Sequence, residues 1–343
     1  EAAGHLPFEP SRAWRKSVID NKRRGREYIS TKGEGADRVI AVHQDGGSSG
    51  KPQSLRAANL PRTVLSAANS AESPTATLVK REMQSWKLLQ LEPSALREPY
   101  NFTAPVQLAS NGAHLPAMLF HLANRPSEDG LDGAAIYTEV ANRLAQLLDD
   151  AGSVHVDRDE RRQLLTLYAT GRDGAQHPAR ALSDGTLRFL ALTVLAIDPE
   201  ARGVICMEEP ENGLHPERIP AMIQLLSDLA TNIKEAVSAD SGNPLRQVIV
   251  NTHSPSVVMQ VPEESLILAE PVEVSLGGRP SRTVQFRCLP GTWRAKAGSP
   301  GGVSKGRLLA YLNPVAHQGR GGRRVVDRED IRQYRIPVAA AGD

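Results

Sequence analysis

The fold is decided by Ala181–Arg188 (ALSDGTLR) and by the two segments that follow it. An apolar helix is predicted from Phe189 to Ile197. Gly203–Pro210 (GVICMEEP) is an apolar strand that runs into two carboxylates, and Val248–Ser254 (VIVNTHS) is a second strand that runs into a histidine. Alternation of strands and helices over residues 182–268 predicts a parallel sheet flanked by helices, with ligands at the carboxyl ends of the strands. We therefore predict an α/β fold.

Composition narrows the class of protein. The chain has 343 residues, and its 41 basic and 39 acidic side chains nearly balance, so global charge does not indicate a polyanionic partner. Two cysteines, Cys206 and Cys288, argue against a disulfide framework. We find no apolar run near the roughly 20 residues that a membrane span needs, and no signal peptide. These features favour a cytoplasmic protein without a membrane partner.

Three regions are expected along the chain. Residues 1–150 form an arm or lid region, residues 151–270 carry the motif segments, and residues 271–343 hold C-terminal strands and a basic, glycine-rich tail. The basic segment Arg12–Arg26 is either a nucleic-acid contact or a solvated face. The alternation of strands and helices weakens beyond Pro271, and residues 291–306 and 317–324 are expected to lack regular structure. The elements predicted outside the motifs are strands at 28–31, 39–42, 154–156, 163–168 and 265–268, and helices at 76–90, 134–148 and 222–230.

The segment Ser183-Asp184-Gly185 stands at the predicted start of a helix. A helix start offers free backbone N–H groups and the positive end of the helix dipole. Ser183 adds a hydroxyl donor, and Gly185 allows a phosphate to approach closely. The alternative is a plain N-cap by Ser183 or Asp184.

Glu208 and Glu209 stand where an apolar strand meets its loop. Adjacent strand residues point to opposite faces, so the two acids can have different tasks. One can hold Mg²⁺ through water, and the other can deprotonate an attacking water. His253, at the end of the other strand, can donate a hydrogen bond to a terminal phosphate. The alternatives are a solvated strand end for the acids and an N-cap neighbour for the histidine. Together and in this order, the three motifs predict nucleotide hydrolysis.

These residues carry a resemblance. Segment 181–254 resembles the C-terminal half of an ABC-type ATPase of the RecF/SMC-like group, whose members are also described as AAA-family or OLD-like ATPases. The matching positions are Ser183–Gly185 for the signature motif, Val204–Glu208 for Walker B, Glu209 for the catalytic glutamate, Glu211–Pro216 for the D-loop region and His253 for the switch histidine. Ser110–Leu115 is a weaker match to the arm region of the group.

The resemblance implies a P-loop ATPase core with an inserted arm or lid, using ATP and Mg²⁺. It implies that Glu208 places Mg²⁺, that Glu209 activates water and that His253 senses the γ-phosphate. Two copies would sandwich ATP, so that Ser183–Gly185 of one copy covers the nucleotide held by the other. DNA or an effector protein would be a further partner. The residues implied to contact ATP are Ser183, Asp184, Gly185, Asn212 and His215.

One motif of such ATPases has no good match. A Walker A loop reads Gly-x-x-x-x-Gly-Lys-Ser/Thr, whereas the nearest string, Gly46–Pro52, is one residue short and has Pro52 in place of the hydroxyl residue. We expect the loop to lie upstream of Glu1 in a longer protein. Three hypotheses follow: an ATPase switch in DNA repair or phage defence, a non-hydrolytic regulatory module, and the ATPase part of a nuclease system. The tail shows no acidic cluster, which argues against a nuclease within this chain.

A geometric expectation follows as well. Glu208, Glu209 and His253 should surround one cleft at the carboxyl ends of neighbouring parallel strands. Ser183 should begin a helix on another part of the surface, because it would serve the second copy.

Overall fold

A computed structural model of the chain describes residues 10–18, 28–43, 52–71, 73–125, 133–238, 242–276, 279–296 and 302–312. Gly46–Lys51, the part of the basic segment beyond residue 18 and the tail from residue 313 lie outside these ranges. Our expectations for those segments therefore stay predictions.

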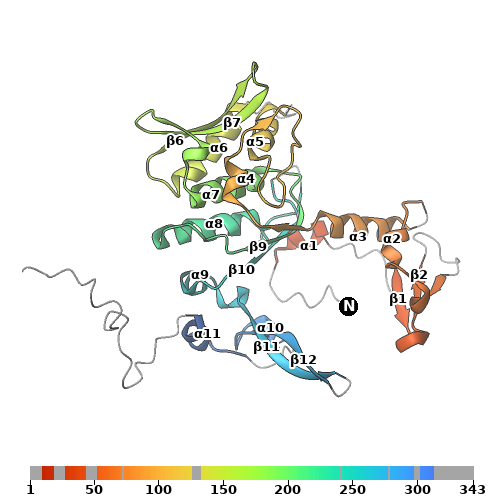
Figure 1. Cartoon of the computed structure of the whole chain (residues 1–343). Coiled ribbons are helices and arrows are strands. Elements are labelled where there is room, and N and C mark those ends of the chain that lie inside the picture. The colour runs from red at the N-terminus through yellow and green to blue at the C-terminus, as the bar shows by residue number, and fades with distance from the viewer. Residues whose placement is uncertain are drawn as a thin grey trace, which may run out of the picture.

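A three-stranded parallel sheet forms the centre of the molecule (Figure 1). Its strands, in spatial order, are β10 (Arg246–Asn251), β9 (Gly203–Glu208) and β4 (Lys87–Leu89). Both neighbours run parallel to β9, which places Asn251 opposite Glu208 and Leu89 opposite Met207. Leu89, Ile205 and Met207 are buried. The predicted parallel sheet is confirmed, and the carboxyl ends of the three strands lie at one edge.

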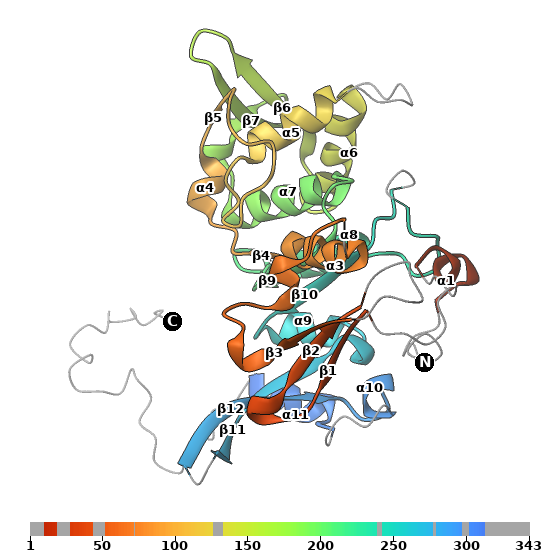
Figure 2. The ribbon, with the colours of Figure 1, turned by 90° about the vertical axis from the view of Figure 1, so that its right-hand side faces the viewer.

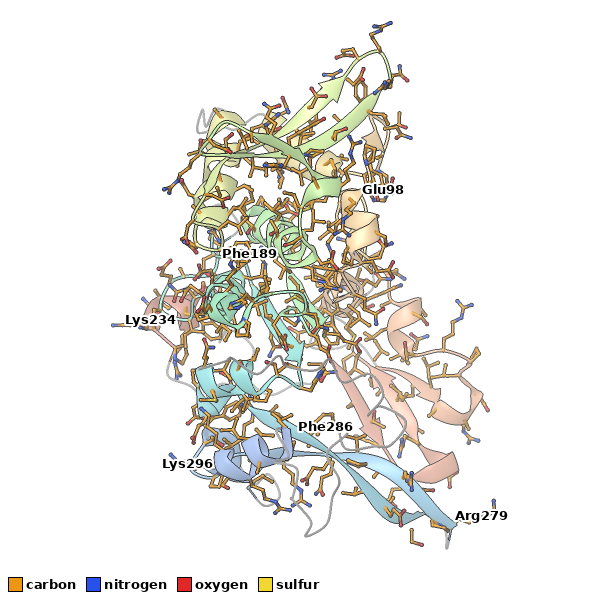
Figure 3. The ribbon with its side chains drawn as sticks, turned by 60° about the vertical axis from the view of Figure 1, so that its left-hand side comes forward. Glu98, Phe189, Lys234, Arg279, Phe286 and Lys296 are labelled. Carbon is orange, nitrogen blue, oxygen red and sulfur yellow. The ribbon has the colours of Figure 1, made fainter. Side chains whose placement is uncertain are left out.

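Two helices pack together beside this sheet, α7 (Asp184–Ile197) and α8 (Ile219–Leu229). Helix α7 is apolar over most of its circumference and is buried from Gly185 to Leu195 except for Arg188, as expected for a helix enclosed on several sides. Figure 3 shows Phe189 of α7 in the middle of the molecule, whereas the labelled Lys234, Lys296 and Arg279 lie at its periphery. Helix α8 instead buries one stripe: Ile219, Met222, Leu225 and Leu229.

A second lobe lies on the other side of α7, at the top of Figure 1. Its sheet has the order β5-β7-β6, with β8 also paired to β7, and all of these pairings are antiparallel. One continuous hydrophobic core joins this lobe to α7, α8 and the central sheet. The elements of the lobe are α4 (Pro93–Arg97), β5 (Tyr100–Asn101), α5 (Leu115–Asn124), α6 (Gly133–Ala145), β6 (Ala151–Asp159), β7 (Leu164–Gly171) and β8 (Gln176–Pro178).

Two peripheral units complete the described chain (Figures 1 and 2). An antiparallel sheet of order β1-β2-β3 stands beside the body, and a two-stranded hairpin, β11 with β12, lies below it. Their strands and the accompanying helices are α1 (Arg12–Val18), β1 (Ile29–Lys32), β2 (Val39–Val42), β3 (Gln53–Arg56), α2 (Val64–Ala67), α3 (Pro74–Ser85), α9 (Pro255–Gln260), β11 (Ile267–Leu276), β12 (Arg279–Cys288), α10 (Trp293–Lys296) and α11 (Lys305–Leu312). Short 3₁₀ helices are η2 (Gly35–Asp37), η3 (Ala57–Asn59), η4 (Ala179–Ala181), η5 (Pro216–Arg218) and η6 (Glu263–Ser265).

Several sequence expectations need correction. The helix predicted over 76–90 ends at Ser85, because Lys87–Leu89 pair with β9 and tertiary pairing overrides the local helical period. Regular structure continues beyond Pro271, where the sequence pattern weakens: β11 extends to Leu276 and pairs with β12 in a hairpin that begins with the pair Ile267↔Cys288. Residues 291–306 are not wholly loose, since they contain α10 and the start of α11. The domain boundaries at residues 150 and 270 stay predictions.

Among the helices of the described ranges, none combines the length and the apolar character that crossing a membrane would require.

Candidate functional site

The candidate site begins where β9 and β10 end. The backbone N–H of Glu209 donates to the carbonyl of Asn251 at 2.8 Å and so extends the strand pairing by one step. Glu209 has a φ of +45°, in the left-handed region that costs a residue with a Cβ about 1–2 kcal/mol. Non-glycine residues held in such a conformation cluster at functional sites. The backbone at Glu209 therefore marks this edge of the sheet as a candidate site.

Glu209 is held by side chains from both loops. Its Oε1 pairs with Nδ1 of His253, and its Oε2 accepts a hydrogen bond from Nδ2 of Asn212 at 2.5 Å. The Glu209 side chain is 30 % exposed and that of His253 is 76 % exposed. Because Nδ1 of His253 faces the carboxylate, Nε2 is the ring atom left for a ligand, and it donates only when the ring is an imidazolium.

Glu208 has a partner that sequence analysis missed. Nε2 of Gln90, the residue after β4, donates to Oε2 of Glu208 at 3.3 Å. Residues 87–89 were expected to be helical, and this hid the fact that Gln90 follows a third parallel strand. Had that strand been predicted, Gln90 would have been expected at the same edge as Glu208.

A cleft of about 380 Å³ lies at this edge. Arg188, on α7, reaches into its wall: Nε donates to the carbonyl of Leu91 at 3.2 Å, and Nη1 donates to the carbonyl of Asn212. Arg188 therefore ties the loop after β4 to the loop after β9, a role that its sequence position did not indicate. The lining residues are Leu89–Glu92, Arg188, Met207–Pro210 and Asn212.

The signature segment lies apart from this cleft. Ser183 caps α7, because its Oγ accepts the N–H of Thr186 at 3.2 Å. Asp184 pairs with Arg97. A Cβ on Gly185 would lie 2.6 Å from the carbonyl oxygen of Gly213, so close packing of α7 against the loop after β9 explains this glycine without a ligand.

His215 has a local role as well. It is the N-cap of η5, and its Nδ1 accepts the N–H of Glu217 at 3.4 Å. Glu208, Glu209 and Asn212 are among the described residues that line the cleft, whereas His253, His215 and Ser183–Gly185 are not. Roles in ATP binding for these residues stay predictions.

Comparison with known families identifies the class of domain. Residues 63–259, more than half of the chain, match the family described as "AAA domain, putative AbiEii toxin, Type IV TA system". The chain belongs to this AAA family. It is therefore an AAA-type ATPase domain, and the matched range contains the sheet, α7, α8 and every lining residue of the cleft.

Solved structures also match part of this chain. An Smc head domain with a coiled coil and joint from Pyrococcus yayanosii is 12 % identical with a TM-score of 0.32, over 53 % of this chain and 29 % of that one. A structure from work on ATP-driven dimerization and DNA-stimulated activation of SMC ATPases is 14 % identical with a TM-score of 0.28, over 44 % of this chain and 83 % of that one. An Smc head with an extended coiled coil, bound to the C-terminal domain of ScpA, from Pyrococcus furiosus, is 9 % identical with a TM-score of 0.29, over 44 % of this chain and 34 % of that one. The chain thus spans less than a third of the first of these structures. No curated protein sequence matches it significantly.

The cleft of the AAA domain fits Mg²⁺ only in part. Within the described residues, no group of three or more His, Cys, Asp or Glu side chains is placed to hold a metal ion. Glu208 supplies a carboxylate to the cleft, and Gln90 donates a hydrogen bond to it. Mg²⁺ in ATPases is commonly held by one or two carboxylates, with waters and the substrate phosphates completing the octahedron. These residues fit a Mg²⁺ ion shared with ATP better than a cage made of protein ligands alone.

Proposed function

We propose that this chain is the signature and Walker B portion of an ATPase that hydrolyses ATP between two copies and acts as a switch in DNA repair or phage defence. The observation that carries the proposal is the Glu209–His253 pair at the carboxyl ends of two adjacent parallel strands. A carboxylate, an imidazole and a second acid at one sheet edge are groups that can activate water and bind phosphate.

Glu209 takes the proton of the attacking water. Its two oxygens are oriented separately, one by His253 and the other by Asn212. Each carboxylate oxygen accepts more than one hydrogen bond, so Glu209 keeps capacity for the water. His253 donates from Nε2 to the γ-phosphate. Glu208, beside Gln90, would hold Mg²⁺, which when bound would neutralise charge on the β- and γ-phosphates.

The second copy contributes through the start of α7. Ser183 and Asp184 are exposed, and the first turn of the helix offers backbone N–H groups and a positive dipole end. Because this end lies outside the cleft of its own chain, it is free to cover a nucleotide held by another copy. The pairing would be a homodimer that forms with ATP.

The family description favours phage defence over DNA repair. It refers to a putative toxin of a type IV toxin–antitoxin system. An effector protein or DNA is proposed as a further partner. The partner itself is part of the proposal.

A second candidate, a non-hydrolytic interaction module, is favoured by one observation. Pro52 stands where a Walker A loop has its hydroxyl residue, and the string before it is one residue short. On this alternative the cleft binds nucleotide weakly and Glu209 has no water to activate.

Two variants test the proposal. In a protein that includes a Walker A loop, Glu209→Gln keeps the shape of the side chain but cannot take a proton, so ATP turnover should fall by about 10²–10⁴, and ATP should then hold two copies together in light scattering. The chain without that loop should hydrolyse ATP poorly or not at all. Ser183→Arg should block the helix start and leave the protein monomeric with ATP. The matched control is Glu160→Gln, which changes an exposed acid outside the cleft. A Glu209→Gln protein that turns over ATP at the parent rate and stays monomeric would contradict the proposal.

A further inference from the structure

A buried acid that the proposed chemistry does not use lies beside the site. Glu211 is only 7 % exposed. Its Oε1 accepts a hydrogen bond from the hydroxyl of Thr252, while its Oε2 is buried with no hydrogen-bond partner in the described part of the chain. An unsatisfied buried polar group typically costs about 1–3 kcal/mol, and more when it is charged. Packing alone does not explain a carboxyl group here, since leucine would fill a similar space without that cost.

Thr252, the residue bound by Glu211, fixes the backbone next to His253 through its hydroxyl. Thr252 donates to Glu211, and its Oγ1 also accepts the N–H of Ser254 at 3.0 Å. The hydroxyl therefore links Glu211 to Ser254 and closes a local turn around His253, as Ser and Thr commonly do.

His253 needs such support, because little else holds it. Its side chain is 76 % exposed, and an exposed ion pair such as that with Glu209 contributes only about 0–1 kcal/mol. The backbone contact from Glu209 to Asn251 ends one residue before Thr252. The Glu211–Thr252 hydrogen bond is the next link between the two loops along the chain.

We propose that Glu211 and Thr252 are positioning residues that hold His253 against Glu209, an inference that rests on the proposed function for the role of His253. The pair sets the backbone from which the imidazole projects. It thereby fixes the distance between the group that would contact the γ-phosphate and the group that would activate water.

The first test does not require ATP. The ¹⁵N signals of the His253 ring are measured at fixed pH in the parent chain and in Glu209→Gln. The Glu209→Gln spectrum is the reference for a His253 ring that has lost its carboxylate partner. Thr252→Val removes the hydroxyl at constant shape, so it should shift the His253 signals toward those of Glu209→Gln. Thr252→Ser keeps the hydroxyl and should leave the signals at the parent position.

A matched control shows whether any buried Thr→Val change has the same effect. Thr193, in α7, is fully buried and its hydroxyl has no partner among the described residues. Thr193→Val should leave the His253 signals unchanged. Parent-like His253 signals in a folded Thr252→Val protein would overturn the inference, and so would equal shifts in Thr252→Val and Thr252→Ser.

Glu211 itself gives the second measurement. Glu211→Gln keeps an oxygen that accepts the Thr252 hydrogen bond, so the His253 signals should stay at the parent position. Glu211→Leu removes that oxygen, so the His253 signals should shift toward those of Glu209→Gln. If ATP turnover is measurable, Thr252→Val should lower kcat and leave KM nearly unchanged. A protein that includes a Walker A loop, shows no ATP turnover and still shows the expected His253 shifts would refute the proposed hydrolysis and leave the positioning role intact.

Discussion

The two ends of the β9–β10 strand pair differ in almost every physical respect. At the carboxyl end, Glu209 adopts a left-handed conformation and pairs with the exposed His253. At the amino end, Arg246 is only 4 % exposed, and its guanidinium donates to four backbone carbonyls. These carbonyls belong to Ala196, Asp198, Ala201 and Leu229.

Arg246 serves the fold. Its carbonyl partners lie at the ends of α7 and α8 and in the loop before β9, groups that a helix end leaves without partners. Burial lowers the pKa of Arg246 to about 10, although the nearby Asp198 opposes this shift. The guanidinium is still protonated at neutral pH and keeps all its donors.

The difference shows that one end of the strand pair stabilises the fold, whereas the other end carries the groups proposed for chemistry. At the amino end the charged group is buried and satisfied by backbone. At the carboxyl end the polar groups satisfy one another only partly, remain accessible and carry backbone strain, as expected where a parallel sheet presents its ligand site. Mutations at the two ends should therefore have different consequences.

The largest expected effect on stability is at the amino end. Arg246→Met should lower the free energy of unfolding by about 3 kcal/mol, because several buried carbonyls lose a charged donor. Chemical denaturation measures this. The control Arg202→Met removes an exposed guanidinium from the neighbouring loop and should change the free energy by less than about 0.5 kcal/mol. Equal effects of the two variants would contradict the role of Arg246.

A smaller loss is expected where α7 meets the loop after β9. Gly185→Ala places a Cβ 2.6 Å from the Gly213 carbonyl and from Leu214 Cδ2, and overpacking of this kind costs about 1–3 kcal/mol. Thermal unfolding should show the loss. Gly306→Ala, which meets no atom within 4 Å, should be neutral or stabilising by up to about 1 kcal/mol. A Gly185→Ala protein as stable as the parent would show that the loop moves away at no cost.

The smallest expected effect has the opposite sign. Glu209→Gly and Glu209→Ala both remove the contacts to His253 and Asn212, but only glycine relieves the φ of +45°. The Gly variant should therefore be more stable than the Ala variant by about 1 kcal/mol, while neither hydrolyses ATP. An Ala variant that is at least as stable as the Gly variant would show that the conformation at Glu209 stores no strain.

Much of the motif region could be predicted from sequence. Apolar runs over 203–207 and 248–250 are long enough to specify buried strands, and the period of α7 and α8 is clear. Strand β4 could not be predicted, because it has only three residues and directly follows a helical pattern. In sequence such a segment looks like the end of the helix, and only its pairing with β9 identifies it as a strand. C-terminal strands were expected beyond residue 271, but the bounds and pairing of the hairpin β11–β12 were not predicted, since proline usually argues against a strand interior.

For the site, the sequence placed Glu208, Glu209 and His253 at strand ends, and the structure brings them together. It did not indicate Gln90 or Arg188, whose relevance depends on contacts with residues about 100 positions away. Glu211 was noted only as part of a motif, because burial and the contact to Thr252 exist only in the fold.

Hydrogen–deuterium exchange with Mg²⁺ and a non-hydrolysable ATP analogue tests the central claim most directly, since it compares the two ends of the strand pair in one experiment. The account predicts slower exchange of backbone amides in residues 207–214 and 251–255, around Glu209 and His253, and unchanged exchange in residues 229–231 and 243–247, around Arg246. Protection confined to the Arg246 end, with none at residues 207–214, would contradict the assignment of the carboxyl end as the nucleotide site.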